Sequence, residues 1–204
     1  MKSLIVLLAL AFTASLSAQT LKLSADSKGV TVDGGVNGLV VLGAPTLTGA
    51  DKKARKATFA PAADGASATA TYADGTVVTI ALSPADGVIL YSFDQIPADA
   101  ISMVITTAIP LSYIEGGSYV ANGAEAKPFP VEPGKQLFGQ GAFKQMDFYT
   151  GTGDGLAFTV PATYQQLQDP RAWGYQNLQW IYHYDFLRYP GKTSFTFKVA
   201  LVKK

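Results

Sequence analysis

Residues 66–93, ASATATYADGTVVTIALSPADGVILYSF, decide the fold class of this chain. Two Asp-Gly pairs, Asp74-Gly75 and Asp86-Gly87, separate three runs that are rich in β-branched, small and aromatic residues. Asp-Gly between alternating apolar residues is a strong hairpin signal, because both residues accept the positive φ that tight hairpin turns require. The stretch therefore predicts three antiparallel strands in a meander.

Short strands and turn signals continue from this meander in both directions. Further strands are expected at residues 30–32, 39–42, 101–109, 142–149, 156–160, 178–187 and 194–202. No segment after residue 18 shows the apolar period of a helix. Many short strands at regular spacing are typical of a sandwich, a jelly roll or a large open barrel. We predict an all-β fold, an antiparallel two-sheet β-sandwich of jelly-roll or expanded-sandwich type.

One long irregular connection interrupts the strand pattern. Residues 116–134 hold three prolines and four glycines. A domain linker is the alternative interpretation, but each half would then have only about 90 residues and few helices to cover its sheet. We therefore expect residues 19–204 to form a single β-sandwich domain with a long surface loop, and loops of this length are often functional.

The N-terminal residues 1–18 have the features of a secretory signal peptide. Lys2 supplies the positive charge, and residues 4–12 form an apolar run shorter than the ~20 residues that a spanning helix needs. Residues 16–18, Leu-Ser-Ala, form a small-residue cleavage site. We expect export through the secretory pathway to the periplasm or the extracellular space, with no membrane span left after the signal is removed.

The composition excludes several classes of site. The chain has no cysteine and one histidine, which rules out disulfides and thiol catalysis and argues against a zinc or copper centre. We expect no metal and no cofactor. Without Lys2 the chain has 15 basic and 15 acidic side chains. A chain with no net charge and no basic cluster is poorly suited to nucleic acid or an anionic membrane, so a neutral or weakly charged partner fits better.

Aromatic residues concentrate in one segment. Residues 164–189 hold both tryptophans, five of the ten tyrosines and the histidine. Within this segment, residues 178–187 alternate, and a strand points successive side chains to opposite faces. One face would carry Trp180, Tyr182, Tyr184 and Phe186, for which core burial is the favoured interpretation. The other would carry Gln179, Ile181, His183, Asp185 and Leu187.

The residues that precede this strand combine flat rings with polar groups. Sugar rings pack their C–H faces on Trp and Tyr, while amides and charged groups bond their hydroxyls. The predicted ligand-binding residues are Gln168, Asp169, Arg171, Trp173 and Tyr175, with His183 and Asp185 as neighbours. Trp173 and Tyr175 lie among turn residues, which favours exposure at a ligand site. For Asp169 and Arg171 the alternative is a simple salt bridge.

On these residues the chain resembles the secreted bacterial β-sandwich domains that bind carbohydrate, alone or attached to polysaccharide-degrading enzymes. The resemblance lies in the exported, cysteine-free all-β pattern and in residues 165–180. It implies non-catalytic binding of a polysaccharide or oligosaccharide. The sequence has no signature motif of that group, so no functional residue is transferred position by position, and the oligomeric state stays open.

Two other functions remain open at this stage. A polysaccharide lyase would use His183 as base, Tyr175 or Tyr182 as acid and Arg171 to neutralise a uronate carboxylate. Gln179 and His183 resemble one strand of the jelly-roll alginate lyases, but the Arg-Glu-Arg and Tyr-x-Lys motifs of those enzymes are absent. In a structural envelope or surface protein, the whole aromatic segment would be core.

Overall fold

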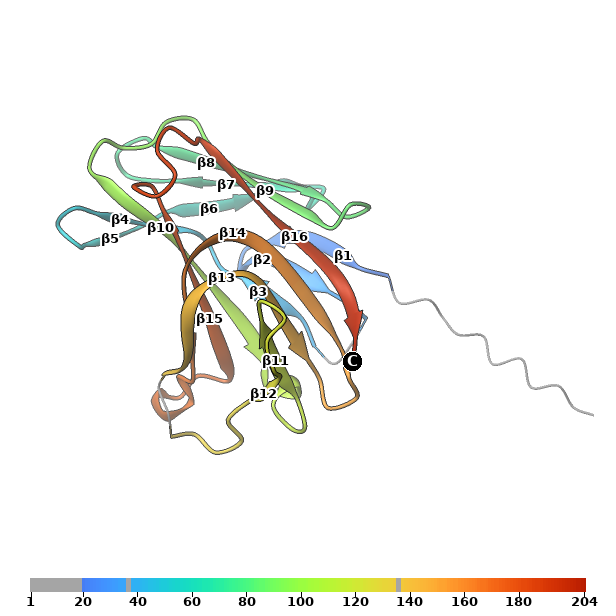
Figure 1. Ribbon diagram of the computed structural model, residues 1–204. Coiled ribbons are helices and arrows are strands. Elements are labelled where there is room, and N and C mark those ends of the chain that lie inside the picture. Colours follow the sequence, from blue (N-terminus) through green and yellow to red (C-terminus); the bar gives the residue numbers. More distant parts are fainter. Residues whose placement is uncertain (1–19, 36–37, 135–136) are drawn as a thin grey trace, which may run out of the picture.

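The structure is a computed structural model that describes residues 20–35, 38–134 and 137–204 (Figure 1). The predicted signal peptide lies outside these residues. The described strands are β1 (Lys22–Asp26), β2 (Gly29–Asp33), β3 (Val40–Leu42), β4 (Thr46–Gly49), β5 (Ala54–Lys56), β6 (Thr58–Pro61), β7 (Ser67–Thr71), β8 (Val77–Ser83), β9 (Val88–Phe93), β10 (Ala100–Pro110), β11 (Ser118–Ala121), β12 (Lys127–Pro128), β13 (Leu137–Tyr149), β14 (Asp154–Gln168), β15 (Asn177–Asp185) and β16 (Ser194–Lys203). Two 3₁₀ turns are η1 (Leu111–Tyr113) and η2 (Arg171–Trp173). None of the described residues forms a helix with the length and hydrophobicity needed to cross a bilayer.

The predicted meander is confirmed by β7, β8 and β9, which pair antiparallel in that order. In the first turn, Asp74 Oδ1 accepts the backbone N–H of Thr76 at 3.0 Å. The second turn needs glycine for two reasons. Gly87 has a φ of 64°, and a Cβ at this position would lie 2.0 Å from the carbonyl oxygen of Val199 on β16.

All the described strands belong to one hydrogen-bonded sheet (Figure 1). Its main path runs β1-β2-β3-β10-β15-β14-β16-β9-β8-β7-β6. The hairpin of β4 and β5 joins β10, and β11 to β13 join the other edge of β14. The two ends of the sheet approach each other, and the Ala25 N–H on β1 donates to the Gly65 carbonyl of the β6–β7 turn at 2.9 Å. The fold is therefore an antiparallel sheet that is nearly closed into a barrel.

The predicted division into two sheets is not confirmed, because β14 pairs with both β15 and β16 and so joins them in one sheet. Residues 154–159 of this strand pair with β16, whereas residues 165–168 pair with β15. Between these segments the carbonyl oxygens of Pro161 and Ala162 accept the hydroxyl groups of Tyr182 and Tyr189 at 3.1 and 2.7 Å. These hydrogen bonds stabilise the region in which β14 changes its pairing from β16 to β15.

The interior is aromatic, as the alternation of β15 predicts. Trp180, Tyr182 and Tyr184 are each at most 1% exposed. The Tyr184 ring stacks on Phe195 of β16 with centroids 4.1 Å apart, and Tyr182 meets Phe197 edge-on at 4.7 Å. Because β15 and β16 do not pair with each other, these ring contacts hold the two strands together across the interior.

A buried amide accompanies the rings. Gln165 is fully buried, and its Oε1 accepts the indole N–H of Trp180 at 2.9 Å. Its Nε2 donates to the carbonyl oxygen of Phe143 at 2.7 Å. The register of β13 against β14 shifts between Phe143 and Gln145. Gln165 therefore provides a hydrogen-bond partner for the Phe143 carbonyl beside this register shift and for the buried indole N–H of Trp180.

Residues 116–134 are more ordered than a surface loop. They contain β11 and β12, which pair with each other, while β11 also pairs with β13. Phe129 is 2% exposed, and its ring lies 6.3 Å from that of Phe148. These strands were not predicted from the sequence, because β12 spans only two residues, one of them Pro128, and the segment around it is rich in proline and glycine.

Candidate functional site

A polar surface covers the outward side of four neighbouring strands, β13, β14, β15 and β10. The strand register aligns Gln140 with Gln166, Gln168 with Gln179, and Ser102 with Asp185. The residues Gln140, Tyr164, Gln166, Gln168, Gln179 and His183 are called the glutamine face below. They occupy alternate positions of their strands, opposite the side chains that fill the interior.

Hydrogen bonds join the side chains of this face into a row. Tyr164 Oη donates to Gln140 Oε1 at 2.9 Å and accepts from Gln166 Nε2 at 2.8 Å. Gln168 Nε2 then donates to Gln166 Oε1 at 3.0 Å. Each group in such a row restricts the orientation of the next. The row therefore presents amide and hydroxyl groups in defined directions rather than as freely rotating side chains.

Exposed aromatic rings lie at the β14–β15 connection. Trp173 and Tyr175 are 57% and 52% exposed, and Tyr164 on the face is 43% exposed. Trp173 is the last residue of η2, and Gly174 follows it with a left-handed φ of 85°. This connection joins the strand ends at which Gln168 pairs with Gln179. The two rings therefore stand beside one end of the glutamine face.

An ion pair fastens this connection. Arg171 donates from Nε and Nη2 to the two carboxylate oxygens of Asp169 at 2.8 and 2.7 Å. Nη2 and Nη1 also donate to the carbonyl oxygens of Pro130 and Val131 at 2.7 and 2.9 Å. These hydrogen bonds lower the pKa of the Asp169 carboxyl below its ordinary range and raise the pKa of Arg171. Four of the five guanidinium N–H groups are thus occupied within the protein.

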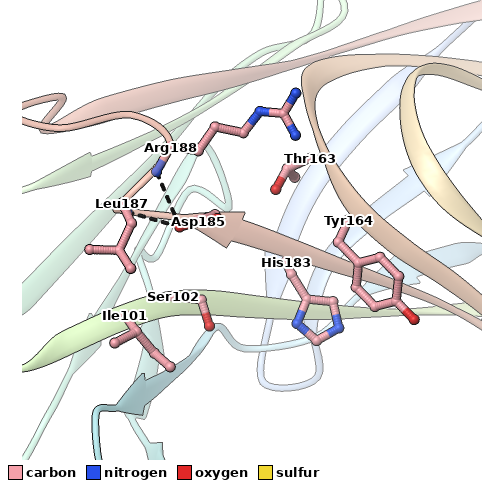
Figure 2. A pocket seen from close by; sticks show the side chains of 8 residues that line it. All are labelled: Ile101, Ser102, Thr163, Tyr164, His183, Asp185, Leu187 and Arg188. Atoms are coloured by element: carbon pink, nitrogen blue, oxygen red, sulfur yellow. Dashed lines mark hydrogen bonds between the residues drawn. The ribbon is translucent and has the colours of Figure 1, made fainter.

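His183 lines a surface pocket at the opposite end of the face (Figure 2). The lining residues are Ile101, Ser102, Thr163, Tyr164, His183, Asp185, Leu187 and Arg188. The imidazole lies 5.4 Å from the Tyr164 ring, centroid to centroid. Burial lowers the pKa of His183 below its ordinary value of 6.5, so the imidazole is neutral at pH 7. Its Nε2 is buried and has no hydrogen-bond partner among the described residues.

Asp185 serves the turn that follows β15. Its Oδ1 accepts the backbone N–H of Leu187 at 2.8 Å and of Arg188 at 3.2 Å (Figure 2). The prediction that His183 and Asp185 share one face agrees with the pocket that both line. No hydrogen bond joins the two side chains within the described part of the chain. Asp185 therefore stabilises the turn and does not orient the imidazole.

The predicted site residues form two groups. Asp169, Arg171, Trp173 and Tyr175 precede Asn177, the first residue of β15, whereas His183 lies six residues further along this strand. At 3.3 Å per residue the separation along β15 is about 20 Å. Gln168 belongs to the hydrogen-bonded row, which continues through Tyr164 to the His183 pocket. The row is thus the connection between the two groups.

The structure does not bring the proposed lyase residues together. Arg171 and Tyr175 lie at one end of β15 and His183 near the other, while Tyr182 points into the core and is fully buried. The tyrosine beside His183 is Tyr164, which is not among the site residues predicted from the sequence. Its signal was available, because Tyr164, Gln166 and Gln168 alternate and must share one strand face.

No protein-family model matches the sequence, and no curated protein matches it. Among solved structures, the chain is similar to a GH31 family sulfoquinovosidase from E. rectale in complex with an aza-sugar inhibitor, with 7% identity and a TM-score of 0.41. The alignment covers 88% of this chain and 32% of that enzyme. The chain thus spans about a third of the enzyme's length, and the low TM-score supports no conclusion about activity.

Proposed function

We propose that this protein binds an uncharged polysaccharide without catalysis, on the glutamine face and the adjoining rings of Trp173 and Tyr175. The observation that carries the proposal is the hydrogen-bonded row of amides and a tyrosine, which runs from the His183 pocket to Gln168. Gln168 is the last residue of β14, and two exposed aromatic rings lie on the connection that follows it. The length of this surface, about 20 Å along β15, suits an extended chain rather than one small molecule.

The chemistry of the face supports a sugar ligand. Amide groups both donate and accept hydrogen bonds, as sugar hydroxyls do, and the middle of the face has no charged side chain among its residues. Trp173 and Tyr175 supply flat apolar surface for the C–H face of a ring. Both rings belong to the β14–β15 connection, whose conformation the Arg171–Asp169 hydrogen bonds restrict, so less conformational freedom is lost on binding.

Two observations favour binding over catalysis. Among the residues that the structure describes, no group is hydrogen-bonded to His183 Nε2 to orient the imidazole. Arg171, the cation assigned to neutralise a uronate, is engaged with Asp169 and two carbonyl oxygens. A structural role alone would not require Trp173 and Tyr175 to be more than half exposed. We further propose that the protein acts after export, on the basis of residues 1–18.

Affinity gel electrophoresis tests the proposal. The mature protein is run through gels that contain soluble cellulose derivatives, xylan, galactomannan, starch or alginate. We expect retardation by at least one of the uncharged polysaccharides, and loss of this retardation in Trp173→Ala. Trp173→Phe retains a flat ring and serves as the matched control, which should keep most of the retardation. Equal mobility of wild type and Trp173→Ala in every gel would reject binding through this ring.

A further inference from the structure

The pocket at the end of the glutamine face has the size and construction of a binding site. Its volume is about 320 Å³, at the lower end of the ~300–1,000 Å³ typical of ligand sites. Residues from β10, β14, β15 and the turn after β15 line it (Figure 2). A pocket of this size accommodates one small polar ring rather than several units of a polymer.

The turn after β15 lies at this end of the face. β15 ends at Asp185, and Leu187 and Arg188 of the turn that follows line the pocket. Asp185 Oδ1 holds the turn by accepting two backbone N–H groups. A polymer that lies along the strands reaches this turn at the pocket, whereas the face continues along β14 and β15 toward Trp173. The geometry therefore favours a chain end over an internal unit.

The lining combines apolar surface with hydroxyl groups. The partly exposed ring of Tyr164 and the side chains of Ile101 and Leu187 provide the apolar part, and Leu187 is 77% exposed. Ser102 and Thr163 add hydroxyl groups, and the neutral His183 adds an imidazole that can donate or accept. This is the mixture that recognises a polyhydroxylated ring.

Opposite charges in the pocket indicate that the ring is uncharged. Asp185 and Arg188 both line it, and no ion pair joins Arg188 to an acidic side chain within the described residues. Figure 2 shows the Arg188 guanidinium directed away from the Asp185 carboxylate and toward Thr163. A guanidinium donates to sugar hydroxyls and a carboxylate accepts from them. An acidic ring would be attracted by Arg188 and repelled by Asp185, so the pair gives it no net electrostatic advantage over a neutral ring.

We propose that this pocket holds the terminal residue of an uncharged glycan chain that extends along the glutamine face. The inference rests on the proposed function and adds a chain-end subsite to it. Tyr164 takes part in both sites, because its hydroxyl belongs to the row and its ring lines the pocket. The protein would then recognise the ends of polysaccharide chains in addition to their length.

His183 permits a direct test, because it is the chain's only histidine. The imidazole resonances of ¹⁵N-labelled mature protein, recorded by NMR, report on this pocket without competing signals. The probes are the methyl glycosides of glucose, galactose, mannose and xylose, with methyl glucuronide as the acidic counterpart. We expect at least one neutral glycoside to shift the imidazole signals saturably. Arg188→Ala should weaken this titration at least fivefold, while Lys22→Ala, which removes an exposed cation of β1 that does not line the pocket, should leave it within twofold of wild type.

The outcomes separate the inference from the proposed function. If polysaccharides still retard the protein through Trp173 but no neutral glycoside moves the His183 signals, the chain-end subsite is wrong and the face proposal stands. If methyl glucuronide alone shifts them, the ring is acidic and the inference is also wrong. A shift by neutral glycosides without any polysaccharide retardation would keep a monosaccharide pocket, but would overturn both the extended face and the chain-end assignment.

Discussion

Replacing Arg171 by alanine is predicted to destabilise the protein strongly, although Arg171 lies on a connection rather than in the core. The change removes four side-chain hydrogen bonds, two to the Asp169 carboxylate and two to the carbonyl oxygens of Pro130 and Val131. Asp169 is 2% exposed. Its carboxylate would remain buried with a single hydrogen bond, from the backbone N–H of residue 171.

The size of the effect follows from these contacts. Removing one partner of a buried ion pair costs ~3–5 kcal/mol, because the remaining charge stays buried without compensation. The Arg171 side chain is 12% exposed and one bond to Asp169 survives, so we expect the lower end, ~3 kcal/mol. For a chain of this length each kcal/mol lowers Tm by ~2–4 °C, so the variant should melt about 6–12 °C below wild type. Urea unfolding followed by circular dichroism measures the difference.

The pH dependence gives a second readout of the same pair. The hydrogen bonds from Arg171 hold the pKa of Asp169 below its ordinary value of 3.8. The resulting stabilisation is complete above pH 3.8 and is lost as the pH falls through the lower pKa of the folded protein. In Arg171→Ala this part of the acid dependence should disappear. Adding Asp169→Asn should recover part of the lost stability, since no charge is then buried.

A loss below ~1 kcal/mol in Arg171→Ala would refute the reasoning, because the pair would then be no stronger than a surface salt bridge. The same conclusion would follow if the acid dependence of the variant matched that of wild type. Arg171→Lys is the matched control. This variant keeps the positive charge but loses the planar guanidinium group and its paired N–H donors, so its free energy of unfolding should lie between those of wild type and Arg171→Ala.

Three further predictions concern other parts of the fold. Gln165→Leu should cost ~2–4 kcal/mol in urea unfolding, because a buried indole N–H and a backbone carbonyl lose their partner; stability equal to wild type would contradict the assigned network. Gly87→Ala should lower the free energy of unfolding by more than ~2 kcal/mol, because of the positive φ and the contact of the new Cβ with Val199. Gly75→Ala should lower it less, because open space surrounds a Cβ at that position. Equal losses of unfolding free energy in the two variants would contradict the contact argument. Burial lowers the pKa of His183, so below pH 6.5 the unfolded chain binds more protons than the folded protein. The free energy of unfolding of the wild type should therefore rise with pH up to about 6.5 and then level off. If burial of the imidazole is not the cause, the difference in unfolding free energy between wild type and His183→Gln should be independent of pH.

The sequence was sufficient to predict the fold class, because the determinants are local. Asp-Gly pairs specify hairpin turns, and alternation along residues 178–187 assigns Trp180, Tyr182 and Tyr184 to the interior. The single curled sheet was not predictable in this way. It depends on β14 changing its partner between residues 159 and 165, and strand pairing over such distances leaves no local pattern.

The candidate site was only partly predictable for a similar reason. Exposure of Trp173 agrees with its position among turn residues, since turns lie at the surface. The engagement of Arg171 with Pro130 depends on a segment about 40 residues away in sequence, which spacing alone does not place nearby. The hydrogen-bonded row that includes Gln140 also depends on residues distant in sequence, because the pairing of β13 with β14 brings Gln140 to Tyr164.

The central claim is tested most directly by tryptophan fluorescence during polysaccharide titration. Of the two tryptophans, Trp173 is 57% exposed and Trp180 is fully buried, so a ligand on the proposed face should affect only the first. We predict a saturable blue shift with an uncharged polysaccharide in wild type, and an unchanged spectrum in Trp173→Phe, where Trp180 alone reports. A shift of the same size in both proteins would place the ligand elsewhere, and no shift in wild type with any uncharged polysaccharide would contradict carbohydrate binding on this face.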